Sequence, residues 1–116
     1  MKAKKDPQHE FVGTWHIDEM ELWDEDYINM EVQAYIEVDA QNMGHFQFGL
    51  VSGQMDGEIV EEGERRRLEF TWDGNDECDE AQGSGWLELT DVNHLEGRIK
   101  FHHGDSSTFT AKRAKG

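Results

Sequence analysis

The sequence predicts an all-β fold, a single antiparallel up-and-down meander barrel of about eight strands with one short helix after the first strand. Three observations predict this fold. Apolar and polar residues alternate in short runs along nearly the whole chain, as they do in strands that bury one face. Turn residues separate the runs at intervals of roughly 8–12 residues, the spacing of a barrel or sandwich. One segment departs from the alternation and has helical spacing instead.

The chain has 116 residues, enough for one domain that buries its own core. We expect the barrel to span residues 11–113. The segments at 1–10 and 114–116 contain few apolar residues, so we expect flexible tails there.

The first apolar-polar run covers residues 12–19 and directs Gly13, Trp15 and Ile17 toward the core. The next segment breaks the period of two, because Trp23, Tyr27 and Met30 stand at i, i+4 and i+7. Asp24 is suited to cap a helix that begins there. We therefore predict a short helix from Asp24 to Met30.

Alternation returns after the helix and predicts three strands. Turns at residues 41–44 and 52–53 separate them, and a turn at 62–64 follows the third. The residues that share the inward faces of these strands are Ala34, Ile36, Val38, Phe46, Phe48, Leu50, Met55, Gly57 and Ile59.

The last part of the chain predicts four more strands, with a long polar loop over residues 73–85 and turns at 91–93 and 104–106. The strand at 86–90 follows the polar loop. The inward positions of the other three strands are Leu68, Phe70, Trp72, Leu95, Gly97, Ile99, Phe101, His103, Phe109 and Ala111.

The charge of the chain restricts the class of partner. The sequence has 26 acidic and 11 basic residues, a formal net charge of −15. Such a surface repels phosphate backbones and anionic lipids, so we expect neither nucleic acid nor membrane as a partner. The acidity chiefly favours solubility. If the protein has a ligand, the acidity favours a small neutral or cationic molecule.

The single cysteine, Cys78, rules out an internal disulfide and favours a reducing compartment. Lys2, Lys4 and Lys5 have no apolar segment behind them that would make a signal peptide, and no run approaches the roughly 20 residues of a membrane span. We therefore expect a cytoplasmic protein.

At Gly13-Thr14-Trp15 the chain resembles the calycin superfamily, which comprises the lipocalins, the avidins and the fatty-acid-binding proteins. The resemblance implies a small up-and-down barrel with a ligand in its mouth, and a contact between Trp15 and Arg113. The aromatic segment after the first strand is similar to the start of fatty-acid-binding proteins, and residues 107–112 to the end of the avidin barrel. The chain lacks the R-x-Y pair of fatty-acid binders, and biotin is not implied.

Aromatic residues and one histidine are the candidate ligand contacts. Trp15 and Trp72 lie on apolar strand faces, where aromatic residues usually belong to the core. Trp86 shares its face with Glu88, which favours a barrel rim or an interface. Trp23 and Tyr27 belong to a helix that covers one barrel end, either over a ligand or as a plug. The candidate ligand-binding residues are therefore Trp23, Tyr27, Trp86 and His103.

The loop after Trp72 is rich in carboxylates and is a candidate metal site. Hard cations such as calcium bind six to eight oxygen atoms. The residues that would supply them are Asp73, Asp76, Glu77 and Asp79, with Glu80 beside them. Their spacing differs from an EF-hand loop, and the alternative is a solvated acidic loop.

No catalytic residue and no cofactor is predicted. His102, His103, Asp105 and Ser106 have the residue types of a hydrolase triad, but adjacent strand residues point to opposite faces. We expect Asp105 and Ser106 to form a turn. The sequence favours a non-enzymatic barrel that binds a small molecule under the helix. The alternative is a structural or self-associating module with a filled barrel, and a homo-oligomer is compatible with either.

Overall fold

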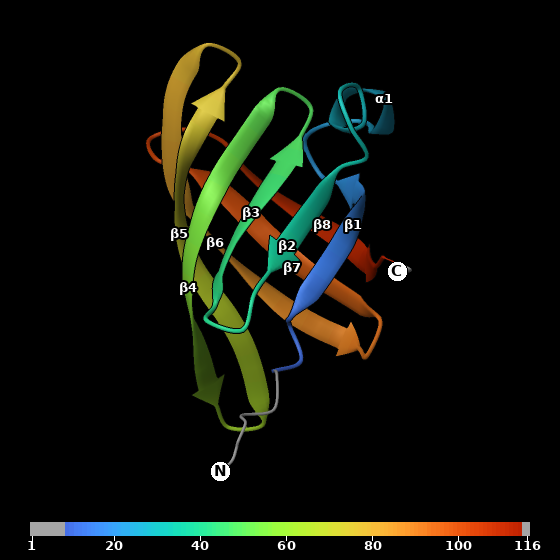
Figure 1. Ribbon diagram of the computed structural model, residues 1–116, viewed down its shortest axis with the longest axis vertical. Coiled ribbons are helices and arrows are strands. Elements are labelled where there is room, and N and C mark those ends of the chain that lie inside the picture. Colours follow the sequence, from blue (N-terminus) through green and yellow to red (C-terminus); the bar gives the residue numbers. More distant parts are fainter. Residues whose placement is uncertain (1–8, 115–116) are drawn as a thin grey trace.

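The computed structural model describes residues 9–114 and is a closed barrel in which each strand pairs antiparallel with the next and β8 pairs with β1 (Figure 1). This architecture confirms the predicted all-β up-and-down barrel with a helix after the first strand. Its elements are β1 Gly13–Met20, α1 Glu25–Ile28, β2 Tyr35–Val38, β3 Met43–Phe48, β4 Val51–Glu62, β5 Arg65–Asp76, β6 Asp79–Asp91, β7 His94–Phe101 and β8 Ser106–Arg113.

Most of the two predicted tails, residues 1–8 and 115–116, lies outside the described residues. Glu10 lies inside them and contacts the barrel, with a carboxylate oxygen 3.0 Å from a guanidinium nitrogen of Arg66. In the described part of the chain, no helix has the length and apolar character needed to cross a membrane.

The inward faces of the strands form one apolar core. Strand residues alternate between buried and exposed because successive side chains point to opposite faces. The buried apolar side chains of the strands are Trp15, Ile17, Met20, Ile36, Val38, Phe46, Phe48, Val51, Met55, Leu68, Phe70, Trp72, Leu87, Leu95, Ile99, Phe109 and Ala111. Most of the predicted inward positions are among them.

Glycines make room for the large aromatic side chains of this core. Trp72 is paired with Gly83 and Phe46 with Gly53 on neighbouring strands. A Cβ atom on Gly53 would lie 2.7 Å from the Trp72 ring and 2.9 Å from the Phe46 ring, too close for any side chain. Phe70 and Phe109 are paired with glycines in the same way. Aromatic rings therefore occupy the space that side chains at these glycines would need.

The barrel is closed on one side by β1 and β8. A β-bulge between Ile17 and Glu19 changes the register of β1, and Met20 is buried after it. The predicted contact of Trp15 with Arg113 is confirmed, because the guanidinium carbon lies 4.2 Å from the centroid of the Trp15 ring.

The helix is shorter than predicted: it begins at Glu25 and ends at Ile28, so Trp23, which the spacing assigns to it, lies before its N-cap. Asp24 caps it as predicted, since its Oδ1 accepts a hydrogen bond of 3.0 Å from the backbone N–H of Tyr27. The prediction that Met30 continues the buried stripe is wrong: its side chain is 54% exposed, and Ile28 is the buried residue of the helix. A single helical turn does not reach the i+7 position.

Two predicted connections are wrong, and glycines explain both errors. The turn expected at 52–53 lies at Gly49 and Leu50, so Leu50 is half-buried in the turn instead of inside the barrel. The loop expected at 73–85 is a hairpin of β5 and β6 with a turn at Glu77 and Cys78. Gly53 and the glycines of this hairpin allow neighbouring strands to approach each other closely. A Cβ on Gly83 would lie 1.7 Å from the carbonyl oxygen of Lys100.

The prediction that His103 continues the inward face of the seventh strand is also wrong. Strand β7 ends at Phe101, and His103 is an exposed turn residue with a φ of 62°. A residue in this left-handed conformation reverses the chain and cannot extend a strand.

Candidate functional site

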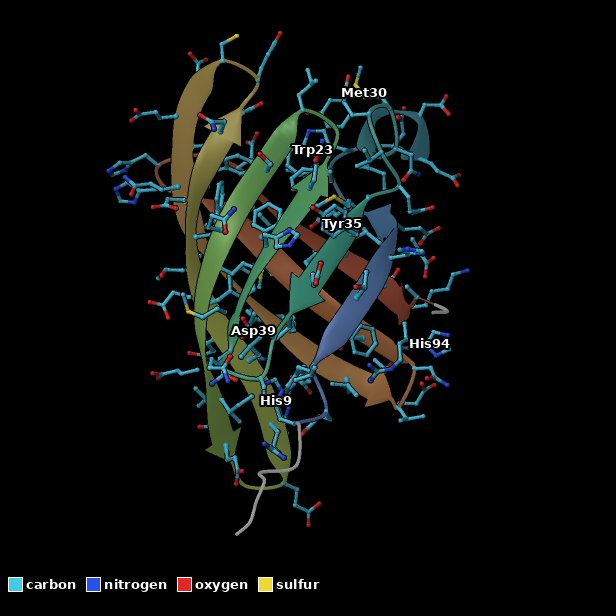
Figure 2. The ribbon with its side chains drawn as sticks, in the orientation of Figure 1. His9, Trp23, Met30, Tyr35, Asp39 and His94 are labelled. Carbon is cyan, nitrogen blue, oxygen red and sulfur yellow. The ribbon has the colours of Figure 1, made fainter. Side chains whose placement is uncertain are left out.

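The barrel end beside α1 holds two of the predicted ligand-binding residues, Trp23 and Tyr27, with ring centroids 6.4 Å apart. The centroid of the Trp23 ring lies 5.1 Å from the ring centroid of Phe48 on β3 and 6.1 Å from that of Phe101 at the end of β7. These strands stand on opposite sides of an eight-stranded barrel. Figure 2 shows Trp23 between the ends of the strands, close to the helix. The Trp23 side chain therefore contacts residues on opposite sides of the barrel at this end.

Tyr27 fastens the helix to the same end. Its hydroxyl oxygen accepts a hydrogen bond of 3.3 Å from the backbone N–H of Leu50. Its ring fills the space over Gly49, where a Cβ atom would lie 2.3 Å from it. The N–H of Gly49 in turn donates to the carbonyl oxygen of Ile28 at 2.8 Å. Helix and hairpin turn are thus packed directly against each other.

Trp86 lies elsewhere, half-buried on the outer face of β6. The guanidinium carbon of Arg67 lies 4.0 Å from the centre of its ring. Glu88 accepts hydrogen bonds from Arg67 at 3.2 Å and from Arg65 at 2.8 Å. These hydrogen bonds lower the pKa of the Glu88 carboxyl, chiefly through Arg65, and the same pair raises the pKa of Arg65. The network joins β5 to β6 where their backbones no longer pair.

Trp23 and Trp86 both border a hollow of about 520 Å³ on the outside of β1, β7 and β8. Acidic side chains line the same hollow, namely Asp18, Glu19, Glu21, Asp24, Glu25 and Glu96. These carboxylates make the electrostatic potential of the hollow negative. Hydrogen bonds within the protein already engage some of them, since Glu21 accepts from the backbone N–H and the hydroxyl of Thr108 at 3.3 Å.

The predicted metal-binding residues lie on the exposed hairpin of β5 and β6. Asp73 and Asp76 belong to β5, Glu77 to the turn, and Asp79 to β6, where it pairs with Asp76. All four are exposed. Within residues 9–114, no group of three or more His, Cys, Asp or Glu side chains is placed to hold a metal ion.

The β7–β8 turn lies against this acidic hairpin, which the sequence did not reveal. The backbone N–H of His102 donates to the carbonyl oxygen of Gln82 at 2.7 Å, and the rings of His102 and His103 are 4.0 Å apart. Asp73, Glu80 and His102 border an open hollow of about 650 Å³ between the two. The turn is held by a hydrogen bond from the N–H of Phe101 to the carbonyl oxygen of Asp105, so Asp105 contributes through its backbone.

A cluster that sequence analysis missed lies on the outer face of β2 and β3. The Tyr35 hydroxyl is 3.0 Å from Nδ1 of His45, and Nε2 of His45 is 3.3 Å from the Glu37 carboxylate. Burial and the negative charge of Glu37 raise the pKa of Tyr35, so the phenol keeps its proton near neutral pH. The cross-strand register would have revealed the cluster, since Glu37 pairs with His45.

Comparison of the chain with protein-family models, with curated proteins and with solved structures gave no match.

Proposed function

We propose that this protein is a non-enzymatic interaction module whose barrel is filled by its own side chains and which contacts a partner through its outer surface. The observation that carries the proposal is the position of Trp23, whose indole stands between Phe48 and Phe101 across one barrel end. A small molecule under the helix, the function that the sequence favours, would have to displace this ring.

The chemistry of the polar clusters supports a non-enzymatic role. Among residues 9–114, the cluster nearest in type to a catalytic relay is Tyr35, His45 and Glu37, and it holds its tyrosine protonated. A tyrosine that acts as a nucleophile or general base near neutral pH needs a lowered pKa instead. The acidic outer surface favours a cationic partner over nucleic acid.

We also propose that the barrel is related in architecture to the calycins. The support is the first-strand Gly13-Thr14-Trp15 triplet, with Arg113 of the last strand stacked on the tryptophan. A reducing compartment such as the cytoplasm suits the exposed free thiol of Cys78.

Indole as a probe tests whether Trp23 is a plug or a lid. Trp23→Ala leaves a space of indole size, which indole should refill, so millimolar indole should raise the Tm of the variant and leave the Tm of the wild-type protein unchanged. Leu22→Ala is the matched control, because Leu22 is an exposed neighbour and its loss opens no space in the core. Saturable stabilisation of the wild-type protein by indole, lost in Trp23→Ala, would show a ligand pocket and overturn the filled-barrel proposal.

A further inference from the structure

The hairpin of β4 and β5 extends past the end of its neighbour β3. Strand β4 pairs with β5 along its whole length to Glu62, but its pairing with β3 ends where Asp56 faces Met43. In the described part of the chain, residues 57–62 therefore have no strand on their β3 side. Figure 1 shows this hairpin projecting at the lower end of the barrel, below the turn between β2 and β3.

The backbone of this segment presents hydrogen-bonding groups to the open side. The N–H of Gly57 points that way, since it donates to the carbonyl oxygen of Asn42 at 2.9 Å. Alternate residues of an antiparallel strand direct their N–H and C=O groups to the same neighbour. Ile59 and Glu61 therefore direct their backbone groups to the same side as Gly57. Between residues 9 and 114, no backbone group pairs with them there.

The side chains of the open edge are acidic. Glu58, Glu61 and Glu62 are exposed, and Val60 is half-buried between them. The three arginines of the facing strand β5 form ion pairs with glutamates of the same chain. Arg66 pairs with Glu61 and Glu10, and Glu88 of β6 holds Arg65 and Arg67. The open edge of β4 is thus negative, and the basic side chains of β5 are already paired with glutamates of the same chain.

We propose that the β4 edge at residues 57–62 binds an extended, basic segment of a partner protein as an added strand. The inference rests on the proposed interaction function and names the class of partner. Main-chain hydrogen bonds to Ile59 and Glu61 would supply affinity, as in other cases of strand addition. Opposite charges that face each other across two strands stabilise the pair.

The register specifies the partner sequence. Burial alternates along β4 from Val51 to Glu58, with the even-numbered residues outward. The period of two then places Ile59 on the inner face, and Val60 and Glu62 on the outer face with Glu58. An added antiparallel strand would therefore carry basic, apolar and basic residues at every second position opposite these three. A second copy of this chain is a poor occupant. Two β4 edges paired antiparallel about Val60 would set Glu58 of each copy against Glu62 of the other.

The probe is the labelled peptide acetyl-TKTVTKT-amide, and its binding is measured by fluorescence anisotropy at low ionic strength with the full chain. We expect saturable binding that Glu61→Pro weakens at least about tenfold, because proline removes the edge N–H. Glu61→Ala is the matched control: it removes the carboxylate and keeps the N–H, so binding should change less than about threefold. Reversing the charge at Glu58 and Glu62 to lysine should also weaken binding at least about tenfold, and acetyl-TETVTET-amide should not bind.

N-methylated peptides give a second readout that needs no protein variant. Methylation of the two central threonines blocks the amides that face β4 and should abolish binding. Methylation of the valine blocks an amide that points away and should leave binding within about threefold of the parent peptide.

Three results would overturn the edge proposal: equal binding by the two N-methylated peptides, equal affinity of the Glu61→Pro and Glu61→Ala variants, or no saturable binding of the parent peptide. Sedimentation that shows a dimer of the free protein, disrupted by Glu61→Pro, would make a second copy the occupant and would also overturn it. None of these results bears on the indole test, so the filled-barrel proposal fails or stands separately.

Discussion

The guanidinium of Arg113 on β8 stacks on the indole of Trp15 on β1, so the last strand and the first strand are joined by a cation–π contact. The same guanidinium donates hydrogen bonds to the backbone carbonyl oxygens of Val12 at 2.9 Å, Val92 at 3.0 Å and Glu10 at 3.1 Å. Arg113 therefore joins the chain before β1 and the β6–β7 turn at one end of the barrel.

Arg113→Lys should lower the free energy of unfolding by about 1–3 kcal/mol, because an ammonium group cannot stack on the ring and reach three carbonyl groups together. Trp15→Ala should cost about 3–5 kcal/mol, since the indole is fully buried. Urea unfolding followed by circular dichroism measures both. Lys112→Ala is the control: this exposed neighbour should change stability by less than about 0.5 kcal/mol. Equal effects of the changes at Lys112 and Arg113 would contradict the anchoring role of Arg113.

Gly83→Ala should prevent folding or lower the Tm by more than 10 °C, roughly the effect of several kcal/mol in a domain of this size. The new Cβ would lie 1.7 Å from the Lys100 carbonyl oxygen, and that backbone cannot move without separating β6 from β7. Gly104→Ala is the matched control, because its Cβ would lie 3.1 Å from the Phe101 side chain and 3.8 Å from the nearest backbone atom beyond its chain neighbours, the carbonyl oxygen of Phe101. Thermal unfolding compares the two variants, and similar Tm values would show that close packing does not explain Gly83.

Glu88 should contribute stability that depends on pH. Hydrogen bonds from Arg65 and Arg67 hold the pKa of this carboxyl below its ordinary value of 4.5. A carboxyl with a lowered folded-state pKa adds stability above its unfolded-state pKa, and this stability disappears as the pH falls through the folded-state pKa. Glu88→Gln should therefore be less stable than the wild-type protein by about 1 kcal/mol at pH 7. The difference should disappear well below pH 4.

Urea unfolding across this pH range tests the Glu88 prediction. Glu96 faces Glu88 on β7, so Glu96→Gln removes a repulsion and should leave stability unchanged or raised at pH 7. A pH-independent difference between Glu88→Gln and the wild-type protein would assign its effect to packing instead of charge.

Calcium should not bind specifically to the β5–β6 hairpin. Asp73, Asp76, Glu77 and Asp79 are exposed, and isolated surface carboxylates hold divalent ions weakly. Millimolar calcium should give the same Tm as sodium chloride of equal ionic strength, which controls for screening of the net charge of −15. Saturable amide shifts confined to these residues at micromolar calcium would instead establish a metal site.

The alternation of side chains carried most of the fold prediction, because the period of two in a strand with one buried face is a local property. It identified the inward sides of Trp15, Phe46 and Trp72. The prediction failed at glycines, because glycine is typical both of turns and of places where strands pack closely. The local sequence predicts a turn at Gly53 and a loop at Gly83, but rings and carbonyl groups of neighbouring strands exclude a Cβ at both positions.

The functional interpretation depended on contacts that no local pattern contains. That Trp23 and Tyr27 lie close together followed from their spacing, although Trp23 precedes α1, but whether the two rings cover a cavity or fill it depends on Phe101 on β7. Most residues of the β5–β6 hairpin beyond Trp72 are exposed, so their sequence shows no apolar alternation and predicts a loop instead of two strands.

The sequence by itself determined that this chain forms a closed meander of strands, that most of the alternating apolar residues face inward, and that its surface is acidic. These properties follow from the period of a strand and from counting charges. Only the tertiary structure decided that Trp23 contacts both Phe48 and Phe101 at one barrel end, that Arg113 also binds three backbone carbonyl groups, and that the β4 edge extends past β3. The reason is physical: strand register and strand length determine which side chains and backbone groups from distant segments meet, and both are settled when the strands pair.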